Sequence, residues 1–267
     1  MKKKLALILA GTAMAAMVLA GCGEKNNASG EDAKTAESVE DKKTFTVGFD
    51  AEYPPYGYMD ENGEYTGFDL ELAEAVCKLE GWELVKKPLN WDSKDMELNS
   101  GSIDCIWNGF TMNGREDDYT FSTPYVDNSQ VIVVAEKSGI DTLEDLAGKT
   151  VGVQAASAAL DLLQSEEEGG QKKLADTFGA LNEFADYNTA FTELQAGALD
   201  ALAIDVGVAN YQIKSRGEGY KILDETLNTE QYAIGFKKGN QELCDVVNAD
   251  LKKLTEDGTV AKLAEKY

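Results

Sequence analysis

Short β-prone runs alternate with helical patterns along most of the chain. The runs that are typical of strands lie at residues 45–49, 83–87, 103–107, 131–135, 150–154, 180–184, 199–204 and 231–236. Between them, apolar residues recur at the three- and four-residue spacing of a helix, as in the series Phe68, Leu72, Val76 and Leu79. Because the order strand–helix–strand is repeated, we predict an α/β fold with mostly parallel sheets and flanking helices.

Glycine and serine residues mark where several helices end or begin. Gly81, Gly148 and Gly197 each follow a helical pattern, and Ser157 is placed to cap the helix after it. A short helix is expected at about 93–100. The apolar face of the last long helix consists of Leu243, Val246, Val247, Leu251 and Leu254.

One sequence pattern occurs twice. Residues 97–104 and 193–200 both read Glu-Leu, two residues, Gly, one residue, an aliphatic residue and Asp, and each copy precedes a predicted strand. A pattern this short can also arise by chance. If it reflects two copies of one α/β unit, the protein has two similar lobes, and the two strand ends, at Asn108–Gly109 and at Asp205, meet across a cleft.

The strand predicted at Ile103–Trp107 runs directly into a polar segment, Asn108–Arg115. Ligands of open α/β sheets bind beyond the carboxyl ends of strands, and this end offers glycine backbone, the Thr111 hydroxyl and the Arg115 guanidinium. Because a guanidinium fork grips two oxygens at once, the segment favours a carboxylate ligand. The alternative is an ordinary loop with a solvated arginine.

The N-terminus has the pattern of a secretory signal, in which Lys2–Lys4 precede an apolar run that is short for a membrane span. The residues before Cys22 resemble a lipobox, the signal of bacterial lipoproteins, which implies cleavage before Cys22 and lipid such as palmitate on it. The alternative is an ordinary signal peptide with an unrelated cysteine. We predict a signal peptide at 1–21, then the lipidated Cys22 and a flexible tether at 22–44. No later run is long enough to cross a bilayer.

Composition removes several classes of function. The net charge is −23, with 48 acidic and 25 basic residues, which argues against a nucleic-acid partner. The chain contains no histidine, which excludes Ser-His-Asp hydrolases and His-ligated zinc but leaves lysine and carboxylate chemistry open. Cys77, Cys105 and Cys244 lie among apolar neighbours in no metal-binding spacing, so we expect them to be small core residues.

Several ordered motifs give residues 45–267 a resemblance to a known family. They are Gly48-Phe49-Asp50, Tyr53-Pro54-Pro55-Tyr56, Gly67-Phe68-Asp69, Asn90-Trp91-Asp92, Gly101 to Asp104, Thr111 to Arg115, Phe121-Ser122, Pro124-Tyr125, Val151-Gly152-Val153-Gln154, Leu199-Asp200-Ala201 and Gly235-Phe236-Lys237-Lys238-Gly239. In this order and spacing they resemble the extracellular solute-binding proteins of polar amino-acid ABC transporters, bacterial solute-binding protein family 3.

The resemblance implies a type II periplasmic-binding-protein-like fold, in which two α/β lobes joined by two crossing strands close on a ligand. The crossings are expected near Val133–Ala135 and Thr229–Tyr232. Lobe 1 would then comprise residues 45–134 and 232–267, and lobe 2 residues 135–231.

The resemblance also implies ligand-binding residues. Arg115 matches the residue that binds the α-carboxylate of an amino acid, and Asp205 matches the acid that binds its α-ammonium. In a dry cleft both charges of a zwitterion need a partner. Tyr53 and Trp91 match the aromatic residues that sandwich the ligand side chain, and Asp50 matches a position near its distal end.

The remaining contacts come from the loop after the first repeat and from a helix start. Gly109 and Thr111 match backbone and hydroxyl contacts to the α-groups, and Asn108 and Phe110 complete this part of the predicted ligand-binding set. Ser157 lies where the family presents the amides of a helix start to the carboxylate.

Two departures from the family pattern bear on ligand choice. The loop from Thr111 to Arg115 is one residue shorter than the usual form, and Ala158 stands where a threonine is common. Other roles stay open for three residues: Trp91 can be plain core, Asp205 a solvated cap, and Asp50 a hydrogen-bonding residue inside its lobe.

We therefore predict a monomeric, lipid-anchored, extracytoplasmic protein that binds a free, polar amino acid and delivers it to an ABC permease. It is held at the membrane through lipid on Cys22 and needs no cofactor and no metal. One alternative is a lyase on the same scaffold that acts on a cyclic acid, with Asp50 or Asp205 as its acid or base. Another is a sensor module, although sensors of this type usually continue into a membrane span and a signalling domain, and we do not expect one here.

Overall fold

The computed structural model describes residues 39–217 and 219–267. The predicted signal peptide, Cys22 and most of the predicted tether lie outside the described residues. Within those two ranges, none of the helices has both the length and the apolar character that a membrane span requires.

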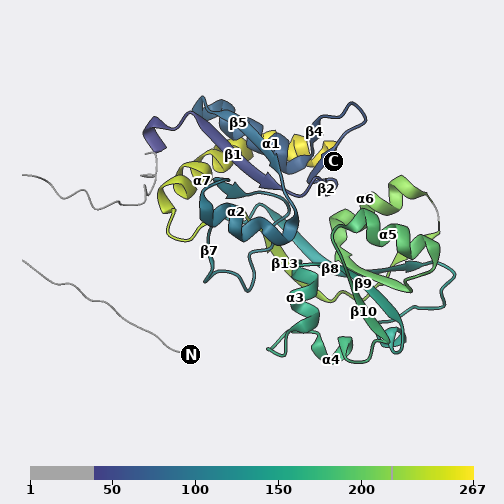
Figure 1. The fold of residues 1–267 in the computed structure, drawn as a ribbon. Coiled ribbons are helices and arrows are strands. Elements are labelled where there is room, and N and C mark those ends of the chain that lie inside the picture. Colours follow the sequence, from purple (N-terminus) through teal and green to yellow (C-terminus); the bar gives the residue numbers. More distant parts are fainter. Residues whose placement is uncertain (1–38, 218) are drawn as a thin grey trace, which may run out of the picture. The chain divides into compact units, whose positions relative to one another are not determined.

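The first sheet has the strand order β5-β1-β6-β14-β7, and its strands β1, β5 and β7 are labelled in Figure 1. Its strands are β1 (Thr44–Phe49), β5 (Glu83–Pro88), β6 (Cys105–Ile106), β7 (Tyr119–Phe121) and β14 (Gly235–Lys237). β1 is parallel to β5 and β6, whereas β14 is antiparallel to β6 and β7. The first sheet is therefore mixed, with a parallel half built from strand–helix–strand units.

The second sheet has the order β10-β9-β11-β8-β12, and β13 pairs with β8 beside this path. Its strands are β8 (Val126–Ala135), β9 (Thr150–Gln154), β10 (Ala180–Phe184), β11 (Ala201–Asp205), β12 (Tyr220–Ile222) and β13 (Asn228–Tyr232). β9 is parallel to β10 and β11, so the order β10-β9-β11 corresponds to β5-β1-β6 of the first sheet. A small antiparallel sheet precedes α1 and consists of β2 (Glu52–Tyr53), β3 (Gly57–Met59) and β4 (Tyr65–Thr66).

Helices lie beside the strands that they connect. They are α1 (Phe68–Glu80), α2 (Lys94–Ser100), α3 (Ala158–Gln164), α4 (Lys172–Ala175), α5 (Tyr187–Ala196), α6 (Val206–Arg216), α7 (Gln241–Glu256) and α8 (Thr259–Lys266), with 3-10 turns η1 (Val39–Asp41), η2 (Trp91–Ser93) and η3 (Glu144–Leu146). α1 contacts β5, α7 and α8. Its buried face includes Leu70 and Cys77, whereas Leu79, which we expected on that face, is 48% exposed. Cys77, Cys105 and Cys244 are buried, as predicted, and all three are free.

The repeated sequence pattern forms the same local structure in both sheets. α2 and α5 end at Gly101 and Gly197, whose φ angles are 75° and 76°. Residues with a side chain are strained in this left-handed conformation, so glycine lets both helices stop and reverse at the same point. In each copy the chain then enters the strand that pairs with the first strand of its α/β unit, β6 beside β1 and β11 beside β9.

The aspartate at the end of each copy of the pattern forms hydrogen bonds with that neighbouring strand. Asp104 accepts a hydrogen bond of 2.7 Å from the Thr46 N–H and donates its own N–H to the Thr46 carbonyl. Asp200 accepts a hydrogen bond of 2.8 Å from the Thr150 N–H and donates its own N–H to the Thr150 carbonyl. Corresponding residues therefore make corresponding hydrogen bonds, which confirms that the two sheets contain copies of one α/β unit.

A two-stranded ribbon connects the two sheets. β8 and β13 run antiparallel and pair from Val126 opposite Tyr232 to Gln130 opposite Asn228. Beyond Gln130, β8 continues between β11 and β12. The crossing expected at Thr229–Tyr232 thus coincides with β13, but the crossing expected at Val133–Ala135 was placed too late, since those residues lie inside the second sheet. The lobe boundaries themselves stay a prediction.

Several elements have no clear sequence signal. The run 231–236 is divided between β13 and β14, which belong to different sheets, and the strand expected at 103–107 is reduced to Cys105–Ile106. α6, α8, β7, β12 and the small sheet were not predicted. In α6 the buried positions Val208, Ala209 and Gln212 do not give a regular apolar stripe, which explains why the pattern missed it.

Candidate functional site

The carboxyl ends of β1 and β9, which are corresponding strands of the two sheets, lie against each other at a cleft. Asp50 follows β1, Gln154 ends β9, and Gln154 Nε2 donates a hydrogen bond of 2.6 Å to Asp50 Oδ2. The cleft beside this contact has a volume of about 690 Å³, within the size range of small-molecule sites. Residues 50–52, 88–93 and Glu97 line it from the first sheet's side, and Ala155 with residues 185–186 from the second.

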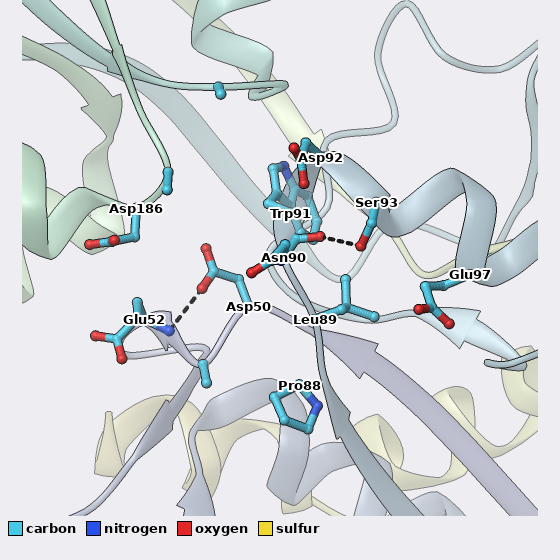
Figure 2. Close-up of a pocket in the computed structure, with 13 residues that line it drawn as sticks. Asp50, Glu52, Pro88, Leu89, Asn90, Trp91, Asp92, Ser93, Glu97 and Asp186 are labelled. Carbon is cyan, nitrogen blue, oxygen red and sulfur yellow. Dashed lines mark hydrogen bonds between the residues drawn. The ribbon is translucent and has the colours of Figure 1, made fainter.

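Asp50 lies at the centre of this cleft, between Asn90 on one side and Glu52 and Asp186 on the other (Figure 2). Its side chain is 5% exposed, and Oδ1 accepts a hydrogen bond of 2.8 Å from the Glu52 N–H. The pKa of Asp50 is raised to about 6, mainly by burial. The hydrogen bonds from Glu52 and Gln154 lower this pKa, and the charges of Asp186 and Glu52 raise it. A cation or a hydrogen-bond donor beside Asp50 would therefore stabilise its ionised form.

The cleft is strongly acidic. Its carboxylates belong to Asp50, Glu52, Asp92, Glu97 and Asp186, and its lining includes no lysine or arginine. Because the walls of a cleft concentrate a field of one sign, this arrangement attracts positively charged ligand groups and repels anions.

Trp91 lines the same cleft and is 8% exposed. Its ring meets the Phe110 ring edge-on at 5.7 Å between centroids, and the Lys94 ammonium lies 5.1 Å from the centroid of the Trp91 ring. Lys94 Nζ also donates to the Ala156 carbonyl at 3.3 Å, on the second sheet's side. Trp91 is thus both packed against the core and placed at the ligand-accessible surface.

Tyr53 lies apart from Trp91, in a cluster of tyrosines. Its ring centroid is 5.9 Å from that of Tyr56 and 6.0 Å from that of Tyr187, and the charge of nearby Asp205 acts on its hydroxyl. Burial raises the pKa of Tyr53 well above its usual range, so the hydroxyl stays protonated. No ring contact among the described residues joins Tyr53 with Trp91, and a ligand side chain held between the two rings stays a prediction.

The loop after β6 is held by a residue that we did not predict for the site. Asp69 is fully buried, and its Oδ2 accepts a hydrogen bond of 2.5 Å from the Gly109 N–H. Gly109 has φ 55°, and a Cβ atom there would lie 3.0 Å from ring atoms of both Tyr53 and Tyr232. Burial raises the pKa of Asp69 to about 7. The neighbours of Gly109 in the predicted set, Asn108 and Phe110, are 1% and 0% exposed.

Thr111 and Arg115 have partners outside their own loop. Thr111 Oγ1 donates a hydrogen bond of 2.7 Å to Glu230 Oε1. The Arg115 guanidinium lies 5.1 Å from the Phe110 ring centroid and pairs through Nη2 with Asp161 Oδ2 on α3, at 2.7 Å. Arg115 therefore links the first sheet's loop to the second sheet's helix.

Ser157 begins α3, as the sequence predicts. Its hydroxyl accepts a hydrogen bond of 3.2 Å from the Leu160 N–H and donates one of 2.7 Å to the Gln154 carbonyl. The cap therefore fixes the start of α3 beside Gln154, the residue that contacts Asp50.

Asp205 lies at the end of β11 and is 3% exposed, so it is not a solvated cap. Its Oδ1 accepts hydrogen bonds from Asn128 Nδ2 at 2.8 Å, Gln130 Nε2 at 2.7 Å and the Tyr232 hydroxyl at 2.6 Å. Burial raises the pKa of Asp205, and the nearby Glu230 carboxylate raises it further. No hydrogen bond or ion pair of the described residues joins Asp205 with Arg115, so the two predicted ends of the site are held separately.

Sequence reasoning missed several residues that surround these groups. They are Asp69, Asn128, Gln130, Asp161 and Glu230. No sequence signal marked Glu230, because β13 reads Asn-Thr-Glu-Gln-Tyr and only the structure shows that Glu230 is buried together with Tyr232. In the part of the chain that the structure describes, no group of three or more His, Cys, Asp or Glu side chains could hold a metal ion.

Known proteins resemble this chain along nearly all of its length. The arginine-binding extracellular protein ArtP of Bacillus subtilis (strain 168) is 33% identical over 271 residues, which cover 100% of this chain and 98% of ArtP. The L-cystine-binding protein TcyA of the same organism is 32% identical over 275 residues, which cover 100% of this chain and 97% of TcyA.

A solved structure has the same fold. It is the substrate-binding protein of an ABC uptake transporter from Streptococcus pneumoniae with bound histidine, with a TM-score of 0.80 and 33% identity, over 86% of this chain and 94% of that one. This match confirms the predicted two-lobed α/β fold of the type II periplasmic-binding-protein class. The sequence pattern of a protein family matches residues 45–267. The chain therefore belongs to the bacterial extracellular solute-binding proteins, family 3.

Proposed function

We propose that this protein binds a free amino acid outside the cytoplasm and delivers it to an ABC permease. Its relatives are named for binding arginine and cystine, and a structural neighbour contains histidine. Those names are of binding proteins, which agrees with the prediction of a protein that is not an enzyme. In this proposal Cys22 carries the lipid anchor, the folded part is a monomer of two lobes, and the ribbon of β8 and β13 is their hinge.

The ligand is an amino acid with a cationic side chain. The observation that carries this choice is the acidic cleft around Asp50, which is lined by carboxylates and by the Trp91 ring and has no basic residue in its lining. A guanidinium or ammonium group would offset the charge of Asp50, whose pKa burial raises to about 6.

A binding screen tests this proposal. The protein is melted in the presence of L-arginine, L-lysine, L-histidine, L-glutamine or L-cystine, and the rise in melting temperature is measured. The affinity of each compound that raises the melting temperature is then determined by titration calorimetry. We expect the cationic amino acids to bind more tightly than glutamine by at least about tenfold, which corresponds to about 1.4 kcal/mol. If no amino acid binds, the proposed function is wrong; if glutamine or cystine binds more tightly than arginine, the choice of a cationic ligand is wrong.

A pair of variants tests whether the acidic cleft causes the preference for a cationic amino acid. Asp50→Asn removes one charge at the centre of the cleft, and Asp224→Asn removes an exposed one outside its lining. Asp50→Asn should weaken arginine binding by about tenfold or more and change glutamine binding much less. Asp224→Asn should leave both affinities within the error of the titration.

A further inference from the structure

Asp205 and Glu230 share hydrogen-bond donors in the ribbon that joins the two sheets. Asn128 Nδ2 donates to Asp205 Oδ1 and to Glu230 Oε1, in each case at 2.8 Å. Gln130 Nε2 donates to the same two oxygens, at 2.7 Å and 2.8 Å. Since both amides bridge the same pair of oxygens, the two carboxylates are held next to each other.

Neither carboxylate has a basic partner. Asp205 is 3% and Glu230 4% exposed, and no ion pair of the described residues includes either one. The other titratable groups whose charge or hydrogen bonds act on Asp205 are tyrosines, from β2, the β2–β3 turn, α5 and β13: Tyr53, Tyr56, Tyr187 and Tyr232. Burial raises the pKa of each of these hydroxyls, so they stay neutral, and the Tyr232 hydroxyl donates to Asp205 Oδ1.

Two adjacent buried carboxylates without a cation are unfavourable when both are ionised. Like charges at such a site push one pKa upwards, so that the pair keeps a proton at a pH at which isolated carboxylates have lost it. The pKa of Asp205 is displaced in this direction, by burial first and by the Glu230 charge second.

We propose that Asp205 and Glu230 act as one acid pair, which holds a single proton before the ligand binds and releases it when the ammonium group of the ligand takes its place. Glu230 is then a residue of the ammonium subsite that tunes affinity through Asp205. This inference rests on the proposed function, because it requires a ligand with an ammonium group at Asp205.

The charge balance of the step is simple. The protein with one proton on the pair takes up a ligand with one ammonium group, and one proton passes to the buffer. Because the ligand ammonium favours the ionised form of Asp205, whose pKa is raised in the free protein, affinity increases with pH while that proton is still bound and levels off above that pKa. Below it, the affinity should fall by about tenfold for each pH unit, the slope that release of one proton requires.

The first measurement needs no ligand. Carbon-13 NMR of labelled Asp and Glu carboxyl groups is recorded between pH 4 and 8, and the signals are assigned with Asp205→Asn and Glu230→Gln. We expect the pair to lose its last proton at a higher pH than the exposed carboxylates do, and Asp205 to titrate at a lower pH in Glu230→Gln. Two carboxylates that are both ionised down to pH 5 would overturn the proposal.

The second measurement detects the released proton. L-Arginine is titrated into the protein by calorimetry in buffers of different ionisation enthalpy, between pH 5 and 8. We expect proton release at the acidic end, and up to one proton of it should be lost in Glu230→Gln. Since burial also raises the pKa values of Asp50 and Asp69, Asp50→Asn and Asp69→Asn identify the source. Release that persists in Glu230→Gln and disappears in either of these variants refutes the acid pair. If arginine does not bind, the choice of a cationic ligand fails, and the NMR titration still decides whether the pair holds a proton.

Discussion

Replacing Asp205 with asparagine tests the predicted ammonium site with little change of shape. The asparagine oxygen can still accept the hydrogen bonds that Asn128, Gln130 and Tyr232 donate to Asp205 Oδ1, so the local network keeps its acceptor. The charge is lost, and the ligand ammonium is then buried against a neutral group. Breaking a buried ion pair by removing one partner costs about 3–5 kcal/mol, which corresponds to a loss of affinity of roughly a hundred- to four-thousand-fold.

The stability of the ligand-free protein should change in the opposite direction. The pKa of Asp205 is raised in the folded state, by burial and by Glu230. A group with a raised folded-state pKa keeps its proton longer in the folded than in the unfolded chain, so folding stability falls as pH rises from the unfolded pKa through the folded one. Asp205→Asn removes this loss, and we expect its melting temperature at pH 7 to equal or exceed that of the parent.

Two assays on one preparation of Asp205→Asn test both the affinity and the stability predictions. Titration calorimetry with the amino acid identified by the screen gives the affinity, and thermal unfolding without ligand gives the stability. Asp224→Asn is the control for loss of one acidic charge. A variant that binds within about threefold of the parent, well under the 1.4 kcal/mol of one decade, refutes the ammonium site. A variant that melts far below the parent refutes the argument that the acid pair is unfavourable.

Three further changes test other parts of the site. Trp91→Leu should remove most of the tryptophan fluorescence change on ligand binding, and leucine variants of Trp82 and Trp107 identify any signal that comes from elsewhere. Arg115→Lys should lower affinity by about tenfold or more in calorimetry, because a lysine cannot grip a carboxylate with two parallel hydrogen bonds; an unchanged affinity would remove Arg115 from the site. Gly109→Ala should destabilise the fold by about 1–3 kcal/mol in urea unfolding, because alanine is strained at φ 55° and its Cβ would lie 3.0 Å from two tyrosine rings; an unchanged midpoint would contradict this.

Features that depend on neighbouring residues could be predicted from the sequence. The strands at 150–154 and 180–184 have the expected bounds, and Ser157 caps α3 as predicted. The repeat is also local, since Gly101 and Gly197 stop their helices through their own backbone conformation. In these cases the signal and its physical cause lie within a few residues of each other.

Features that depend on distant pairing could not be predicted in the same way. The polar first half of β8 is a strand because it pairs with β13, about 100 residues later in the chain, as in the Gln130–Asn228 pair. That pairing turns Asn128 and Gln130 towards Asp205, and no local pattern shows it. The partner of Arg115 is likewise on another element, because Asp161 lies on α3 of the second sheet.

The two ends of the predicted ligand site are held by contacts of unequal strength. Arg115 pairs with Asp161, whose side chain is 62% exposed, and an ion pair with such an exposed partner contributes about 0–1 kcal/mol. A ligand carboxylate that replaced Asp161 as the partner of Arg115 would therefore cost the protein only this small contribution to its stability. Asp205 is buried without a basic partner, so a ligand ammonium would supply the opposite charge that no side chain around Asp205 supplies. On this argument the ammonium end supplies more of the binding free energy than the carboxylate end, and an amino acid with a blocked amine should lose more affinity than one with a blocked carboxylate.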